Sequence, residues 1–202
     1  MHIVCSDLEG VFVPEIWINV AEKTGIAELR LTTRDISDYD VLMKKRLSIL
    51  DAHNLKLKDI TDVIATMVPL AGAVDFLDWL RSVTQVIVVS DTFVEFAGPL
   101  MKKLGWPALF CNHLSVGPDG AITGYHLRQT DGKRKSVLAM KSLNFKTIAM
   151  GDSYNDISML KEADAGILFR PPANVVEEFP EFPVTHDYTD IRARIEKILA
   201  GK

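Results

Sequence analysis

Four short apolar runs carry the strongest constraint on the fold of this chain. Each run is continuous rather than alternating, and segments with a helical spacing of apolar residues separate them. Continuous apolar strands are typical of a parallel sheet whose two faces are covered by helices. The sequence therefore predicts an α/β fold with a doubly wound, Rossmann-like parallel sheet. The runs are residues 3–5, 86–89, 147–150 and 165–169.

The interval between the first two runs predicts an insertion. Roughly 80 residues separate these runs, whereas a crossover between parallel strands needs only about a dozen. The whole chain of 202 residues fits one core domain with a small insert. We expect residues 14–70 to form a helical cap inserted after the first strand, and residues 1–13 and 71–202 to form the core. The expected cap helices are 14–23, 36–53 (with Ser37 as N-cap) and 57–67.

Three further features complete the expected core. The turn residues Gly117-Pro118-Asp119-Gly120 indicate a β-hairpin at the sheet edge, within residues 110–127. Pro99 interrupts a helical pattern, so this helix either starts near Gly98 or kinks there. The other expected core helices are 73–82, 156–163 and 189–199.

Composition excludes several classes of protein. The net charge of −4 gives no basic footprint, so we expect neither a nucleic-acid nor a membrane partner. Two cysteines are too few for a disulfide framework, and the five histidines show no zinc-ligand spacing. The beginning of the chain lacks the pattern of a signal peptide, and we expect a cytoplasmic protein. The oligomeric state stays open, with a homodimer as one alternative.

Polar side chains follow three of the four runs. Asp7 and Glu9 come after the first run, Ser90 after the second, and Asp152 and Asp156 after the third. Ligands of open α/β sheets bind beyond the carboxyl ends of the strands, so these groups converge on one rim. Converging carboxylates repel one another unless a cation neutralises them, and oxygen ligands favour Mg²⁺ that shares its remaining positions with a phosphate.

These groups resemble a known family in their order along the chain. The set resembles the haloacid dehalogenase superfamily of phosphotransferases, and the helical insert matches the cap position of that superfamily. Its four motifs correspond here to Asp7-Leu8-Glu9-Gly10-Val11, Ser90, Lys133 and Gly151-Asp152-Ser153-Tyr154-Asn155-Asp156.

Within the superfamily the chain most resembles the phosphoserine phosphatases, especially across residues 151–160. Two positions depart from their pattern. Glu9 stands where those enzymes have aspartate, and Ser90-Asp91-Thr92-Phe93 replaces a segment with two glycines between serine and phenylalanine. These departures resemble the branch that is both phosphoserine phosphatase and phosphoserine:homoserine phosphotransferase.

The resemblance implies a mechanism with an aspartyl-phosphate intermediate. Asp7 would attack phosphorus, and Glu9 would protonate the leaving oxygen and then deprotonate the next acceptor. Mg²⁺ would be held by Asp7, Asp152 and the main-chain carbonyl of Glu9. The phosphoryl oxygens would be held by Ser90, the Asp91 amide and Lys133.

The resemblance also implies how the rest of the substrate is bound. Glu15 would bind its ammonium group and Arg46 its carboxylate, because the planar guanidinium pairs bidentately with a carboxylate. Asn155 would contact the substrate, and Asp156 would orient the metal's surroundings.

Two assignments stay open from the residues alone. Lys135 is an alternative to Lys133 as the phosphate-binding lysine, because both lie in one basic triplet. Asp91 places a carboxylate beside the bound phosphate, which it would repel unless its side chain turns away.

We therefore expect a Mg²⁺-dependent phosphatase that hydrolyses O-phosphoserine, with homoserine as a second acceptor. One rival is a haloacid dehalogenase-like phosphatase for another small phosphomonoester, and the other is a non-catalytic phosphoamino-acid sensor. The sequence leaves open whether hydrolysis or transfer dominates, and which pathway the protein serves.

Overall fold

The protein is built around one mainly parallel sheet, seen in a computed structural model that describes residues 1–33, 35–36 and 38–201. In these residues the strand order is β4-β3-β2-β1-β5-β6-β7, and only the pair β3 and β4 is antiparallel. The predicted α/β fold with a parallel sheet and an edge hairpin is confirmed. The strands are β1 (His2–Ser6), β2 (Gln85–Phe93), β3 (Ala108–Val116), β4 (Ile122–His126), β5 (Lys146–Gly151), β6 (Ala165–Phe169) and β7 (Val184–Thr185).

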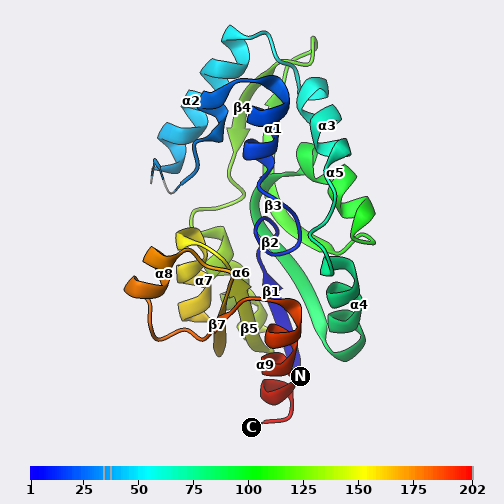
Figure 1. Cartoon of the computed structure of the whole chain (residues 1–202), viewed down its shortest axis with the longest axis vertical. Coiled ribbons are helices and arrows are strands. Elements are labelled where there is room, and N and C mark those ends of the chain that lie inside the picture. The colour runs from blue at the N-terminus through cyan, green and yellow to red at the C-terminus, as the bar shows by residue number, and fades with distance from the viewer. Residues whose placement is uncertain (34, 37, 202) are drawn as a thin grey trace.

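Helices cover both faces of the sheet (Figure 1). Successive residues of a strand point to opposite faces, so Val4 packs with α4, α5 and α9, while Ile3 and Cys5 pack with α6, α7 and α8. Both faces are therefore apolar, which explains the continuous runs. The core helices are α4 (Ala73–Val83), α5 (Val94–Lys103), α6 (Gly132–Ser142), α7 (Ile157–Glu162), α8 (Ala173–Glu178) and α9 (Tyr188–Leu199), with a 3₁₀ turn, η2 (Tyr154–Asp156), before α7.

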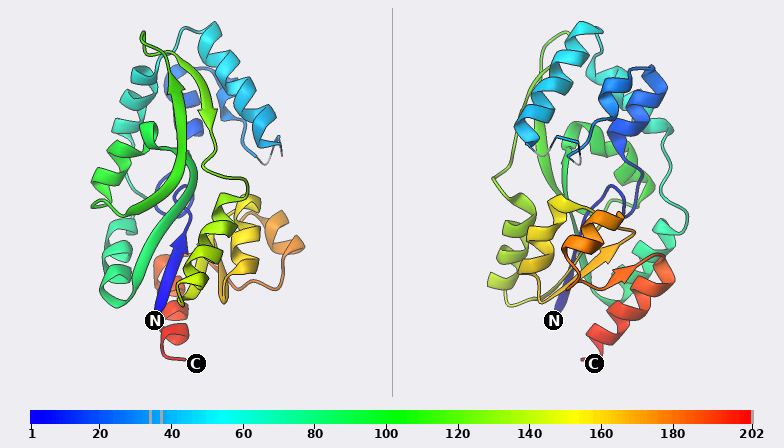
Figure 2. Two further views of the ribbon diagram at one scale, coloured as in Figure 1. Left: turned by 180° about the vertical axis from the view of Figure 1, so that it is seen from behind. Right: turned by 60° about the vertical axis from the view of Figure 1, so that its left-hand side comes forward.

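The chain between β1 and α4 forms helices α1 (Ile16–Thr24), α2 (Tyr39–Ala52) and α3 (Leu57–Thr66) and the 3₁₀ turn η1 (Ala27–Arg30). These helices lie beyond one end of the sheet, beside the β3–β4 hairpin (Figure 2). Ile60 and Ile64 of α3 belong to the same apolar cluster as Val4, so the inserted helices and the core share one apolar cluster. Asp38 caps α2 by accepting hydrogen bonds from the amides of residues 40 and 41, while the expected N-cap Ser37 lies outside the described residues.

Two details differ from the expectations. Helix α5 starts at Val94 and continues through Pro99, so a start near Gly98 is wrong. Proline at this position removes the hydrogen bond to the carbonyl one turn earlier and crowds that carbonyl. Burial of Phe96 and Leu100 against the sheet stabilises the helix around it. Strand β2 runs beyond Val89, with an irregular register before Phe93, so Ser90 lies within the strand rather than after it.

The topology places a binding crevice at the end of β1. The chain winds from β1 to β2 and β3 in one direction, while β5, β6 and β7 extend in the other. Such a reversal of strand order leaves a crevice at the carboxyl ends of the two central strands, here β1 and β5. None of the helices in the described residues has both the length and the apolar character needed to span a membrane.

Candidate active site

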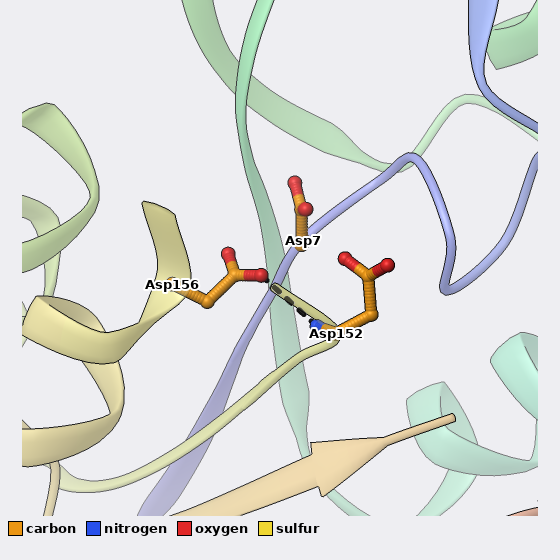
Figure 3. Close-up of side chains that lie close together, drawn as sticks. All are labelled: Asp7, Asp152 and Asp156. Atoms are coloured by element: carbon orange, nitrogen blue, oxygen red, sulfur yellow. Dashed lines mark hydrogen bonds between the residues drawn. The ribbon is translucent and has the colours of Figure 1, made fainter. Parts of the chain in front are cut away.

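Three carboxyl groups converge in this crevice (Figure 3). Asp7 directly follows β1, Asp152 directly follows β5, and Asp156 ends η2. A carboxylate oxygen from each lies within 4.8 Å of the others, and all three residues are buried. The amide of Asp7 donates to the carbonyl of Met150 at 2.9 Å, so the sheet's own hydrogen bonding brings the two strand ends together.

Hydrogen bonds and an ion pair within the protein fix the Asp156 carboxylate. Its Oδ2 accepts hydrogen bonds from the amides of Asp152 and Ser153 at 2.9 and 3.1 Å, and its Oδ1 lies 2.7 Å from the Lys133 ammonium. A Cβ atom at residue 151 would overlap the Asp156 carboxyl group, so only Gly151 allows this close approach. Asp156 therefore fixes the loop that carries Asp152, which fits an orienting role.

Lys133 places a positive charge against the acidic cluster. It lies at the start of α6, is 3% exposed, and its Nζ is 2.9 Å from Asp7 Oδ1. Burial alone would lower the pKa of Lys133, but the carboxylates of Asp156, Asp7 and Asp91 outweigh it and hold that pKa well above its ordinary value. Lys135 is exposed and forms no ion pair with any described carboxylate, so only Lys133 reaches the site.

The acidic cluster has the chemistry of a divalent-cation site. Burial, followed by the charge of Asp156, raises the pKa of Asp7 well above its ordinary value, while Lys133 opposes this shift. A cation against these oxygens would favour their ionised forms and reverse the shift. The donors are all carboxylate oxygens, which suit hard cations rather than zinc or copper.

Strand β2 brings Ser90 and Asp91 to the same crevice. The Asp91 carboxylate accepts a hydrogen bond from Asn155 Nδ2 at 3.0 Å, and its main-chain carbonyl accepts one from the Tyr39 hydroxyl at 3.0 Å. Ser90 Oγ accepts from the amide of Thr92 at 3.1 Å. The Asp91 carboxylate is thus held by Asn155, and 4.0 Å separate it from Lys133 Nζ.

The Glu9 carboxyl group lies at the N-terminus of α1. Its Oε2 accepts a hydrogen bond from the amide of Ile16 at 2.7 Å. Burial, followed by the nearby charge of Glu15, raises the pKa of Glu9 to about 8, while Arg46 and Lys133 lower it. A carboxyl group with such a pKa can hold a proton near neutral pH and give it to a leaving group.

Arg46 of α2 faces the crevice from the inserted helices. Its Nη2 donates to the carbonyl of Leu31 at 2.8 Å, and its guanidinium lies 4.5 Å from the centre of the Trp17 ring. Its Nε is buried without a hydrogen-bond partner among the described residues. Burial lowers the pKa of Arg46 to about 10. The guanidinium therefore keeps an unused donor for an anionic ligand.

A cavity of about 80 Å³ joins these groups. Asp156 lies behind its wall, and every other residue expected to act in the site contributes to its lining: Asp7, Glu9, Glu15, Arg46, Ser90, Asp91, Lys133, Asp152 and Asn155. The sequence reasoning missed Tyr39, which also lines the cavity. Tyr39 lies seven residues, or two helical turns, before Arg46, so the two side chains share one face of α2. This spacing could have indicated that Tyr39 lies near the site.

Known proteins resemble this chain in sequence and in fold. The family model for haloacid dehalogenase-like hydrolases matches residues 18–161. A Pseudomonas aeruginosa protein named phosphoserine phosphatase ThrH is 60% identical over 197 residues, covering 98% of this chain and 96% of that protein. A Pseudomonas syringae pv. tomato protein named phosphoserine phosphatase is 59% identical over 197 residues, covering 98% of this chain and 83% of that protein.

A solved structure described as a phospho-aspartyl intermediate analogue of phosphoserine phosphatase has the same fold. It superposes with a TM-score of 0.77 at 24% identity, covering 96% of this chain and 97% of that chain. The chain therefore belongs to the haloacid dehalogenase-like hydrolases.

Proposed function

We propose that this protein is a phosphatase that hydrolyses O-phosphoserine to serine through a phosphorylated Asp7. One observation carries the proposal: a single small cavity is lined by the buried side chains of Asp7 and Lys133 together with Glu15 and Arg46. The charges of Glu15 and Arg46 complement the ammonium and carboxylate groups of an amino acid. The names of the two relatives that match nearly the whole chain support the same substrate.

The reaction divides between the residues as follows. A carboxylate oxygen of Asp7 attacks phosphorus, and Glu9 donates its proton to the departing serine oxygen. Glu9 then takes a proton from a water molecule that attacks the aspartyl-phosphate, which releases phosphate and restores Asp7. Throughout, Ser90, the Asp91 amide and Lys133 bind the phosphoryl oxygens, where negative charge shifts during in-line transfer.

Mg²⁺ fits the acidic cluster as the cofactor. It would be held by Asp7, Asp152 and the main-chain carbonyl of Glu9, with Asp156 orienting the loop of Asp152. When bound, the ion neutralises the carboxylate and phosphate charges that would otherwise repel each other. The convergence of three buried carboxyl groups supports a requirement for such a cation.

The inserted helices, which we take as a cap of residues 14–70 on a core of residues 1–13 and 71–202, would select the substrate. Glu15 would bind its ammonium group and Arg46 its carboxylate, and the unused Nε of Arg46 supports this role. Homoserine would act as a second acceptor in the place that serine vacates, because an in-line attack must come from the side opposite to Asp7.

Phosphate release from phosphoserine, measured with and without Mg²⁺ and homoserine, tests this function. We expect Mg²⁺-dependent release, and phosphohomoserine formation when homoserine is added. A panel of phosphomonoesters in which phosphoserine is among the poorest substrates would reject the roles of Glu15 and Arg46. Binding of phosphoserine without any phosphate release would instead indicate a sensor.

A further inference from the structure

A second, larger cavity adjoins the first. Its volume is about 590 Å³, and the two cavities share Thr33, Tyr39, Ser90, Asp91, Lys133 and Asn155 as lining residues. Because a single water needs about 10–15 Å³ of such space, the larger cavity can hold an ion with its hydration water. Figure 2 shows the chain that leads from β4 to α6, which contributes Leu127 and Arg128 to this cavity.

The two cavities reach different sides of the site. Ser90 and Lys133, which bind the phosphoryl oxygens, line both cavities. Asp7, Glu9 and Arg46 line only the smaller one. In the proposed mechanism the leaving group lies opposite Asp7 and next to Glu9, and Glu15 and Arg46, the residues proposed to bind its charged groups, also line only the smaller cavity. The larger cavity also opens onto the phosphoryl position, because Ser90 and Lys133 line it.

Arg128 gives the larger cavity a cation. Its Nη2 contacts only uncharged partners, Ser136 Oγ at 3.0 Å and the Gly132 carbonyl at 3.4 Å, and its guanidinium lies 5.3 Å from the centre of the Phe110 ring. Across residues 1–33, 35–36 and 38–201, no carboxylate oxygen lies within 4.0 Å of its nitrogens. An arginine without an acidic partner at a cavity wall suits a small oxyanion, which it can bind through two parallel hydrogen bonds.

Asp91 and Asn155 form part of the boundary between the cavities. Their side chains share a 3.0 Å hydrogen bond, and both residues line both spaces. The Asp91 side chain is 39% exposed and lies 4.0 Å from Lys133 Nζ. A carboxylate there weakens the hold of Lys133 on a phosphate ion, while Arg128 attracts that ion onward.

We infer that the larger cavity is the release vestibule for inorganic phosphate, with Arg128 as its binding residue. The inference rests on the proposed function, because it concerns the product of that reaction. It separates the path of phosphate from the space of the amino-acid group. Phosphate can then leave without crossing the cavity that the next substrate occupies.

Titration of the Mg²⁺-loaded protein with inorganic phosphate tests the vestibule directly. In Arg128→Gln we expect phosphate affinity to fall about three- to tenfold, as for loss of one partly exposed charge-assisted contact. The inhibition constant of phosphate against phosphoserine hydrolysis should rise by the same factor. Arg134→Gln is the matched control, since Arg134 lies on α6, pairs with Glu162 at 2.9 Å and lines neither cavity. Equal phosphate affinity in wild type and Arg128→Gln would overturn the inference.

A second variant controls for a structural effect of Arg128→Gln, because Arg128 contacts the first turn of α6. Leu127→Trp fills the cavity without removing that contact, and it should weaken phosphate binding by a similar factor. Serine release in a single turnover should stay at the wild-type rate in this variant, because the smaller cavity is untouched. Unchanged phosphate inhibition in Leu127→Trp would also overturn the inference. A wild-type protein that binds phosphate but releases none from phosphoserine would reject the proposed function instead.

Discussion

The Lys133 ammonium and the Asp7 carboxylate form a buried ion pair, with 2.9 Å between Nζ and Oδ1. The proposed nucleophile therefore contacts the proposed phosphate-binding cation in the protein without any substrate. Asp156 holds the same ammonium from its other side at 2.7 Å, so the position of Lys133 does not depend on substrate. In the proposed mechanism, this preorganisation would let the site bind a phosphoryl group without moving its own cation.

Replacing this lysine should cost both stability and activity. In Lys133→Met two buried carboxyl groups lose their partner, and we expect the free energy of unfolding to fall by about 3 kcal/mol. Phosphate release should also fall steeply, since no other described cation contacts Asp7. Denaturant unfolding and a phosphate-release assay measure the two effects. Lys135→Met is the control two residues away and should change neither quantity. A reversed outcome would make Lys135 the catalytic lysine.

Asp7→Asn should abolish hydrolysis and transfer alike. Asparagine keeps the size of the side chain but is a poor nucleophile, so we expect phosphate release to fall by at least about 10³-fold. The circular dichroism spectrum should stay native, because the amide of residue 7 still bonds to the carbonyl of Met150. Asp62→Asn, at an exposed position of α3, should retain full activity. Normal turnover by Asp7→Asn would exclude the covalent intermediate.

Mg²⁺ should stabilise the folded protein even without substrate. The ion binds a cluster that exists only in the native state, so at saturating concentration we expect the melting temperature to rise by about 5 °C or more. Excess EDTA should remove the increase. Asp152→Asn should lose most of it, whereas Asp164→Asn, outside the cluster, should keep it. An equal melting temperature with and without Mg²⁺ would show that the acidic cluster is not a cation site.

The sequence predicted the parts of the site that follow from the sheet alone. Asp7 and Asp152 come directly after apolar strands, and the carboxyl ends of parallel neighbours must meet. The choice between Lys133 and Lys135 could not be made in this way, because it depends on which face of α6 points inward. That face is set by the packing of Val137 against the sheet, a tertiary contact that the basic triplet does not encode.

Other features depend on contacts between distant segments. Tyr39 reaches the carbonyl of Asp91 only because the inserted helices lie at the end of the sheet where Asp91 is located, and the two residues are 52 positions apart in sequence. Arg128 lies in a connection without regular secondary structure, where no periodicity indicates the direction of a side chain. The residues that line only the larger cavity therefore had no signal in the sequence, whereas most residues that line the smaller cavity did.

Arg46→Lys should raise the KM for phosphoserine by about tenfold or more while changing kcat less. Lysine keeps the charge but loses the planar fork, and it lacks the Nε that has no partner among the described residues of the wild-type protein. Lys44→Gln is the control on the same helix, where an exposed lysine pairs only with Asp40 among the described acids.

Phosphoethanolamine gives this prediction its sharpest form, because it has the ammonium and phosphate groups of phosphoserine but no carboxylate. If Arg46 binds the carboxylate, the wild-type protein and Arg46→Lys should hydrolyse phosphoethanolamine with the same high KM. If the KM values of Arg46→Lys rise equally for both substrates, Arg46 does not bind the carboxylate. Its role would then be to pack α2 against Trp17, where its guanidinium lies.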